Sequence, residues 1–199
     1  MKMKKKFDSQ MLLAIAVLII SGAALIVSMR QASIMNKQTD ILLEQTKSSA
    51  WPRLSVGFDQ SWSDKTLEYL KIPVHNKGTG PAIIEGVRIT YNGEVTKDWW
   101  DLFRKVKVPD SINTGISNRG IYNSVISANE SFYWMQLEND PRLRHWVYEK
   151  KEKITIEICY KSVFNDYWLF RKEGLNGTTV IQKLDTPECP LPSDEMFKS

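Results

Sequence analysis

The sequence predicts a mainly β protein, in which one N-terminal transmembrane helix and a short helical stalk precede a β-sandwich with two inserted short helices. The first observation is a run of uncharged residues near the N-terminus, 9–29. The second is a series of about seven short segments in which apolar and polar residues alternate, a pattern typical of half-buried strands. Turn residues separate these segments, and short strands joined by turns favour a sandwich over an α/β fold.

The apolar core of that run, residues 11–29, predicts a membrane-spanning helix. Its 19 residues would extend about 28 Å, which matches the hydrocarbon core of a bilayer. Four lysines precede it, namely Lys2, Lys4, Lys5 and Lys6. Because fewer basic residues follow closely, the positive-inside rule predicts a cytoplasmic N-terminus and an exported C-terminal domain. A signal peptide cleaved at Ser21-Gly22-Ala23 is the alternative, but the apolar run continues through Leu25-Ile26-Val27 and favours an uncleaved anchor.

The chain is expected to have five segments: a basic cytoplasmic N-terminus (1–10), the transmembrane helix (11–29), a helical stalk or linker (30–50), the sandwich (51–185) and a C-terminal tail (186–199). The stalk lacks Gly and Pro, and it is too short to predict a coiled coil. Small residues recur every four positions at Ala24, Ser28 and Ala32, a spacing that lets membrane helices approach closely. A homo-oligomer formed through the transmembrane helix and stalk therefore stays open.

The net charge of +4 belongs to the anchor and its flanks. Residues 1–50 contain seven Lys or Arg and three Asp or Glu, whereas residues 51–199 contain twenty of each. A nucleic-acid-binding domain is expected to carry an excess of positive charge in its folded part. The balanced charge therefore argues against nucleic acid as a partner. The expected partners are the membrane lipid bilayer and another envelope protein.

The predicted strands follow a period of two. Leu54, Val56 and Phe58 alternate with polar or small residues, and a second strand is expected at 69–74. Further strands are expected at 82–92, 121–126, 131–137, 154–160 and 167–171. The dipeptide Asn92-Gly93 predicts a tight turn after one of them.

Two short helices are expected between the strands. Thr96 is the predicted cap of a helix at 97–106. Its expected apolar face comprises Trp99, Leu102, Phe103 and Val106. Asn139 or Asp140 is the predicted cap of a second helix, with Pro141 at its first position. Its inward side chains are expected to be Leu143, Trp146 and Val147.

The string Asn76-Lys-Gly-Thr-Gly-Pro-Ala82 predicts a structural turn between two strands. Gly78 can take a positive φ, Pro81 favours an extended Gly80, and the Asn76 side chain can bind backbone N–H groups. A phosphate-binding loop would need a different glycine spacing or a glycine run that opens a helix. Because residues 83–87 predict a strand, the structural interpretation is favoured.

The two cysteines, Cys159 and Cys189, both lie in the predicted exported domain. In an oxidising compartment such a pair predicts a structural disulfide. The bridge would close a loop of about 30 residues and add roughly 3–4 kcal/mol of stability. The tail around Cys189 has few apolar residues, which favours a covalent tether. Two unrelated buried thiols are the alternative.

The Asn-x-Gly-x-Gly-Pro-Ala string behind one membrane helix resembles a group of uncharacterised bacterial single-pass membrane-anchored proteins. The segment 158–168 is similar to a Cys-Tyr-Cys-Ser-Val-Phe…Cys-Trp segment in some of them, from which it departs at Lys161 and Tyr167. The resemblance implies an immunoglobulin-like β-sandwich, located on the periplasmic or extracellular side of the bacterial inner membrane. It also implies that Cys159 is left to pair with Cys189. It implies no activity.

Catalytic motifs are scarce in this sequence. His75 and His145 are expected to be surface residues, and no residue spacing predicts a metal or cofactor site. Asp98 and Asp101 share a helix face, where carboxylates are usually solvated. Trp99-Trp100 is a candidate aromatic binding platform, although the core is expected to take at least one of the two rings.

These observations predict a non-enzymatic single-pass membrane protein whose exported β-sandwich serves protein binding or envelope assembly. One alternative is a membrane-tethered envelope hydrolase with a site around the polar loop 108–120. Another is an exclusion or immunity protein of a mobile element.

Overall fold

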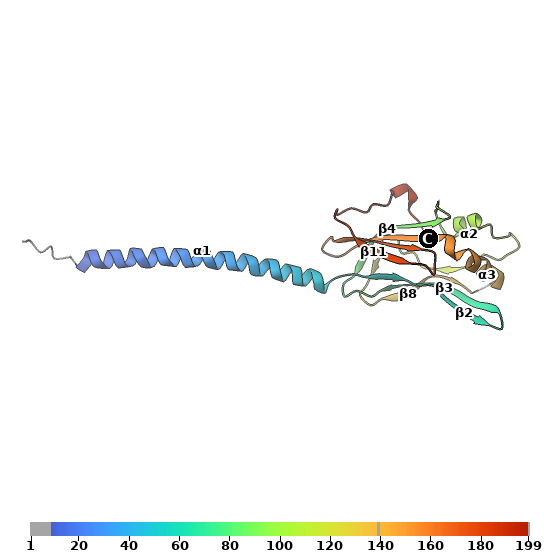
Figure 1. Cartoon of the computed structure of the whole chain (residues 1–199), viewed down its shortest axis with the longest axis horizontal. Coiled ribbons are helices and arrows are strands. Elements are labelled where there is room, and N and C mark those ends of the chain that lie inside the picture. Colours follow the sequence, from blue (N-terminus) through green and yellow to red (C-terminus); the bar gives the residue numbers. More distant parts are fainter. Residues whose placement is uncertain (1–8, 139, 199) are drawn as a thin grey trace, which may run out of the picture. The chain divides into compact units, whose positions relative to one another are not determined.

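The computed structural model describes residues 9–138 and 140–198. They form two compact units, of which the second begins at Ser49. The first unit is formed by a single helix, α1 (Ser9–Ser49, 41 residues; Figure 1). This helix is continuous through both the predicted transmembrane segment and the predicted stalk. Most of the predicted cytoplasmic segment, 1–8, lies outside the described residues.

Helix α1 is long and apolar enough to cross a membrane. None of its described side chains is buried within the protein, and Leu18 is 73% exposed. The hydroxyls of Ser21 and Ser28 donate to carbonyl oxygens of their own helix, those of Val17 (2.7 Å) and Ala24 (2.9 Å). Such internal hydrogen bonds satisfy polar groups that would otherwise be costly in lipid. The helix therefore presents an apolar surface that the rest of the described chain leaves uncovered.

The second unit contains the strands and two further α-helices. The described strands are β1 (Leu54–Val56), β2 (Asp59–Ser63), β3 (Thr66–Asn76), β4 (Ala82–Tyr91), β5 (Glu94–Thr96), β6 (Ser117–Asn118), β7 (Val125–Ile126), β8 (Ser131–Leu137), β9 (Ile154–Lys161), β10 (Tyr167–Glu173) and β11 (Thr179–Lys183). The helices are α2 (Trp99–Val106) and α3 (Pro141–Lys150), with 3₁₀ turns η1 (Lys151–Lys153) and η2 (Ser193–Glu195).

The strands form two antiparallel sheets. The first has the order β1-β3-β8-β6, and β2 also pairs with β3. The second has the order β11-β10-β9-β4-β5, and β7 also pairs with β4. In Figure 1 the two sheets of the domain face each other, and α2 and α3 lie at the same end as the β2–β3 hairpin.

One hydrophobic core lies between the sheets. Trp134 of β8, Ile72 of β3 and Phe170 of β10 are at most 1% exposed. Each fully buried side chain of this kind stabilises the fold by about 1.5–3 kcal/mol. Because a shift by one residue would turn every such side chain to the opposite face, this burial also sets the strand register.

The structure confirms the predicted order of a long apolar helix followed by two antiparallel sheets. The expectation of a mainly β chain needs correction, since helix and strand account for about equal shares of the described residues, 34% and 33%. The long helix α1 accounts for most of the helical share. The alternation also fails to predict β2, β5, β6 and β11, because these strands are short or largely exposed on both faces.

The C-terminal tail folds back onto the second sheet. Phe197 enters the main core at 1% exposure, and its N–H donates to the Val87 carbonyl (2.7 Å). Leu191 and Met196 are buried in a second cluster, on the opposite face of this sheet. The expectation that too few apolar residues hold the tail is therefore wrong. Three apolar side chains, Leu191, Met196 and Phe197, anchor it.

Candidate binding surface

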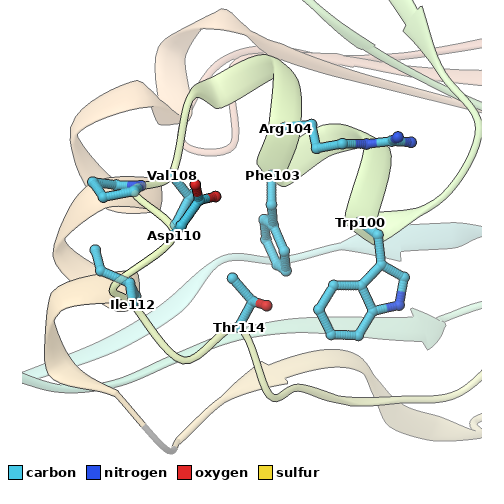
Figure 2. A pocket seen from close by; sticks show the side chains of 8 residues that line it. Trp100, Phe103, Arg104, Val108, Asp110, Ile112 and Thr114 are labelled. Carbon is cyan, nitrogen blue, oxygen red and sulfur yellow. The ribbon is translucent and has the colours of Figure 1, made fainter.

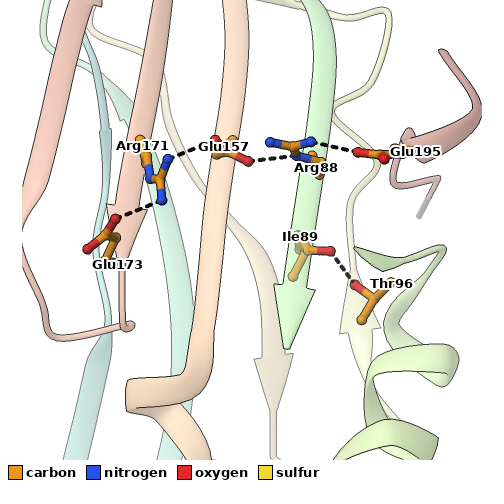
Figure 3. Close-up of polar contacts among 7 residues, drawn as sticks. All are labelled: Arg88, Ile89, Thr96, Glu157, Arg171, Glu173 and Glu195. Carbon is orange, nitrogen blue, oxygen red and sulfur yellow. Dashed lines mark hydrogen bonds and ion pairs between the residues drawn. The ribbon is translucent and has the colours of Figure 1, made fainter. Parts of the chain in front are cut away.

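Helix α2 is fixed by reciprocal capping. The Asp98 side chain accepts a hydrogen bond from the Asp101 N–H (2.7 Å), and the Asp101 carboxylate accepts one from the Lys97 N–H (3.0 Å). The cap is therefore Asp98 and not Thr96, because these bonds satisfy the free N–H groups at the helix start. Thr96 is buried and donates its hydroxyl to the Ile89 carbonyl (2.9 Å; Figure 3). The two carboxylates thus have a structural role.

Helix α2 divides its two tryptophans between core and solvent. Trp99 is 2% exposed and packs edge-on against Trp134 and Phe197, with ring centroids 5.2 and 4.9 Å away. Trp100 is 51% exposed and contacts the Phe103 ring at 6.1 Å. The proposed aromatic platform therefore reduces to a single outward ring on a fixed helix.

A groove of about 560 Å³ lies beside Trp100, and we call it the Trp100 groove (Figure 2). Its lining residues are Trp100, Phe103, Arg104, Val108, Pro109, Asp110, Ile112 and Thr114. In Figure 2 the rings of Trp100 and Phe103 hang from α2 towards the loop that carries Thr114. The charged side chains, Arg104 and Asp110, are of opposite sign. The groove is thus mixed in character, with an aromatic end.

The loop that forms the far wall, residues 107–116, is held in place by the start of α3. Asp140 accepts hydrogen bonds from the N–H groups of Arg142 (2.8 Å) and Asn113 (3.3 Å). The Arg142 guanidinium pairs with the Asp140 carboxylate (2.8 Å) and donates to the Ser111 carbonyl (3.1 Å). The Arg142 side chain, followed by these N–H groups, lowers the pKa of Asp140 to about 2. The loop is therefore tied to α3 at two points.

Asp140 is the observed cap of α3, with Pro141 at the predicted first position. The alternative cap, Asn139, lies outside the described residues. Leu143 and Val147 face the core as predicted, each 1% exposed. Trp146 is half-buried and donates its ring N–H to the Val106 carbonyl (3.0 Å), which joins α3 to α2.

A second groove, of about 540 Å³, lies along α3 and shares Ile112 with the Trp100 groove. It contains Thr66, His145 and Glu149, residue types that catalyse hydrolysis when they form a chain of hydrogen bonds. His145 Nε2 lies 3.3 Å from Glu149 Oε1. Within the described chain no hydrogen bond joins Thr66 to His145, so the nucleophile–base contact is not formed here.

The remaining chemical candidates occupy separate places. His75 lies on β3, in register with Ser55 and Ser131. No group of three or more His, Cys, Asp or Glu side chains that could hold a metal ion occurs in residues 9–138 and 140–198. The loop at 108–120 brings Asp110 and Thr114 to the Trp100 groove.

The string that predicts a structural turn is organised by the buried side chain of Asn76. Its Oδ1 accepts hydrogen bonds from the N–H groups of Arg53 and Gly78 (both 3.0 Å). Its Nδ2 donates to the carbonyls of Gly80 (2.8 Å) and Ile126 (3.1 Å). One amide therefore ties together the start of the domain, the turn and the approach to β8.

Gly78 and Gly80 are required by close approach of the backbone. A Cβ at Gly78 would lie 2.2 Å from the Trp51 carbonyl oxygen, and one at Gly80 would lie 2.1 Å from that of Ala50. The expected positive φ at Gly78 is wrong, since the described glycines with positive φ lie elsewhere. Pro81 directly precedes β4. Contact with residues distant in sequence, which the turn pattern does not reveal, explains the glycines.

The predicted disulfide is not formed in the structure. Cys159 and Cys189 are free thiols, and they hydrogen bond to each other. That hydrogen bond, together with burial, raises the pKa of the Cys159 thiol, and the same bond lowers that of Cys189. The pair lies where the tail crosses the outer face of β9. The apolar anchors of the tail bring Cys189 to Cys159, so the bridge between them stays a prediction.

A chain of ion pairs crosses the same face of the second sheet (Figure 3). Arg88 of β4 contacts Glu157 of β9 and Glu195 of the tail, both at 2.6 Å. Arg171 of β10 lies 3.8 Å from Glu157 and 2.8 Å from Glu173. The Glu157 side chain is 6% exposed, and burial of a charge demands such partners. The pair Arg88–Glu195 connects the tail to this face of the sheet.

The fold and this surface define a class: an apolar N-terminal helix joined to a two-sheet domain that carries an exposed tryptophan groove. The chain belongs to the family described as "Domain of unknown function (DUF8453)", whose profile matches residues 11–180. The match begins at the apolar run and ends within β11, ahead of the tail. No curated protein and no solved structure matches the chain.

The sequence pattern misses several residues of this surface. Val108 and Ile112 are apolar residues inside a polar loop, and this anomaly is the signal that could have located the groove wall. Arg142 and Ser111 are 31 residues apart, and nothing in the local sequence links them.

Proposed function

We propose that this is a single-pass membrane protein with its N-terminus in the bacterial cytoplasm, whose exported domain binds another envelope protein through the Trp100 groove. We further propose that the domain is an immunoglobulin-like sandwich, related to the bacterial anchored proteins with the Asn-x-Gly-x-Gly-Pro-Ala string. The uncovered apolar surface of α1 and its four preceding lysines support the placement in the inner membrane.

The observation that carries the binding proposal is the exposure of Trp100. Its ring is 51% exposed on a helix whose other large apolar side chains are buried. A tryptophan beside a groove is a common energetic centre of protein interfaces. The ties of the groove wall to Asp140 and Arg142 support a preorganised surface, which reduces the entropy cost of association.

Site-specific photocrosslinking in intact cells tests this proposal. A photoreactive phenylalanine analogue at position 100 of the full chain is expected to give a discrete adduct. The same analogue at Tyr133, which is 43% exposed on β8, is the matched control and is expected to give none. Trp100→Ala is expected to weaken co-purification of the captured protein by at least about tenfold, and Trp100→Phe by less. Identical adduct patterns at the two positions, or none at either, would contradict the proposal.

A further inference from the structure

The domain has an open side, where edge strand β1 of one sheet and edge strand β11 of the other line a groove of about 800 Å³. We call it the edge groove. Its cationic lining residues are Arg53, Lys77 and Lys183, and its aromatic ones are Trp51 and Trp168. The described lining contains no Asp or Glu. The edge groove shares no residue with the Trp100 groove.

Strand β11 leaves one backbone edge unpaired. Among the described strands it pairs with β10 alone. The bond from the Leu184 N–H to the Tyr167 carbonyl (2.8 Å) sets the phase of this ladder. Hydrogen-bonded pairs alternate along an antiparallel ladder. Alternate residues of β11 therefore turn their N–H and C=O groups to the free edge, namely Thr179, Ile181 and Lys183. These are the β11 residues that line the edge groove.

The opposite wall is edge strand β1, which is partly covered. The bond from the Gly57 N–H to β3 places the N–H of Leu54 and the C=O of Val56 on the outer side of β1. The Lys172 ammonium donates to the Val56 carbonyl (2.9 Å). The Tyr160 side chain is buried near Leu54, and burial raises the pKa of Tyr160 to about 12. A side chain of the second sheet therefore binds one outward carbonyl of β1, whereas no hydrogen bond within the described residues reaches the outward groups of β11.

The charges at this groove are largely uncompensated. Within the described part of the chain, Arg53 and Lys77 have no carboxylate within 4.0 Å, and both are exposed. Lys183 lies 2.9 Å from Asp166 and is 61% exposed. The Arg53 guanidinium lies over the Trp51 ring at 5.8 Å. A ligand in this groove would thus contact three cationic side chains, those of Arg53, Lys77 and Lys183.

We propose that the free edge of β11 binds an acidic protein segment in extended conformation, as an added strand whose carboxylates contact Arg53, Lys77 and Lys183. The unpaired backbone groups favour a peptide over other anions, because strand addition draws affinity from main-chain hydrogen bonds. The cations select the acidic side chains that alternate into the groove. An exposed edge strand without a specific partner can pair with strands of other chains and so promote aggregation.

The probe for the test is a fluorescent peptide of about eight alternating Thr and Glu residues, long enough to cover β11, which spans roughly 17 Å. Fluorescence anisotropy with the full chain in neutral detergent is expected to show saturable binding that weakens with salt. A peptide with Lys in place of Glu is expected not to bind. Absence of Thr-Glu binding at low salt would overturn the proposal.

Two matched pairs of variants test charge and edge separately. The double variant Arg53→Glu and Lys183→Glu is expected to weaken binding at least about tenfold, whereas Lys153→Glu, an exposed site outside the groove, changes it less than about twofold. Ile181→Pro removes an outward N–H without breaking the β10 ladder and is expected to abolish binding. Ile181→Ala keeps that N–H and is expected to retain it.

Backbone methylation of the probe keeps the protein unchanged, so it tests the edge even where a variant fails to fold. Methylating one alternate set of peptide nitrogens is expected to abolish binding, and methylating the other set to preserve it. If the two methylated peptides bound equally and an anionic polysaccharide displaced them completely, strand addition would be overturned, and the groove would be a site that binds anions through charge alone. Trp100→Ala is expected to leave peptide binding unchanged, so failure of one site is distinguishable from failure of the other.

Discussion

Single residues in this domain derive their roles from contacts that are distant in sequence. Asn76 is 0% exposed, and its amide bonds to the start of the domain and to the residues before β8. Gly78 lies against the backbone of Trp51 and Arg53. A side chain there would collide with main chain, which cannot move aside as a flexible side chain would.

The first prediction concerns this close approach. Gly78→Ala is expected to destabilise the domain by about 3 kcal/mol, because the added methyl group overpacks against backbone atoms. For a domain of this size the melting temperature is expected to fall by about 6–12 °C. Thermal unfolding of the full chain in detergent measures the change. Lys77→Ala, an exposed substitution in the same turn, is the control and is expected to stay within about 0.5 kcal/mol. Equal melting temperatures for the two variants would contradict the steric explanation.

At the scale of elements, the start of α3 has two roles. It caps its own helix through Asp140, and it ties down the loop 107–116. The shape of the Trp100 groove therefore depends on a carboxylate that belongs to another element. Because protonation would remove the negative charge of this carboxylate, we expect acid to loosen the groove wall.

The second prediction follows from the lowered pKa of Asp140, about 2 against a usual 3.8. A carboxyl group with a depressed folded-state pKa contributes stability that is complete above its unfolded pKa and is lost as the pH falls. The melting temperature is therefore expected to fall between about pH 4 and pH 2 more steeply for the native chain than for Asp140→Asn. Asparagine keeps a helix cap but does not ionise.

Glu130, whose pKa is lowered by the Ser127 N–H and then by Arg119, titrates in both proteins. The difference between the two plots of melting temperature against pH therefore measures the contribution of the Asp140 carboxylate alone. Parallel curves over this range would show that the Asp140 carboxylate does not stabilise the folded state.

At the scale of the whole molecule, the charge distribution matches the division into two units. The basic surplus belongs to residues 1–50, and the sheet domain carries twenty groups of each sign. The domain has its own closed core, and its tail packs onto the domain itself. The proposed topology places this domain and the N-terminus on opposite sides of the membrane.

The third prediction tests that arrangement. In a Cys189→Ala background the buried Cys159 gives little labelling. A new cysteine at Ser63, exposed on β2, is expected to react with a membrane-impermeant maleimide in intact spheroplasts. A cysteine at Ser9 is expected to react only after lysis. The reverse pattern would place the domain in the cytoplasm.

The parts of the fold that follow from local pattern were predictable. The apolar run predicts α1, and alternation predicts the long strands, since both depend on periodicity along the chain. β11 was not predictable, because an edge strand exposed on both faces has no apolar period. The glycine turn was located correctly, but its glycines were explained by the wrong cause.

The candidate surfaces were less predictable than the fold. The apolar pattern of 97–106 correctly assigned Trp99 to the inward face of the helix. The groove beside Trp100, in contrast, depends on bonds between the loop 107–116 and α3, which no local pattern reveals. The contact between the Cys159 and Cys189 thiols likewise depends on the path of the tail, which brings Cys189 to β9.

Local sequence patterns are enough to predict a helix that can cross a membrane, a strand-rich domain of balanced charge after it, and the order of the main elements. These properties follow from hydrophobic periodicity and charge counts, which depend only on residues close together in the chain. The packing of the two sheets, which local patterns do not reveal, settles which edge strand stays unpaired, where the grooves lie and what anchors the tail. Those outcomes depend on contacts between residues far apart in the chain, and local sequence carries no record of such contacts.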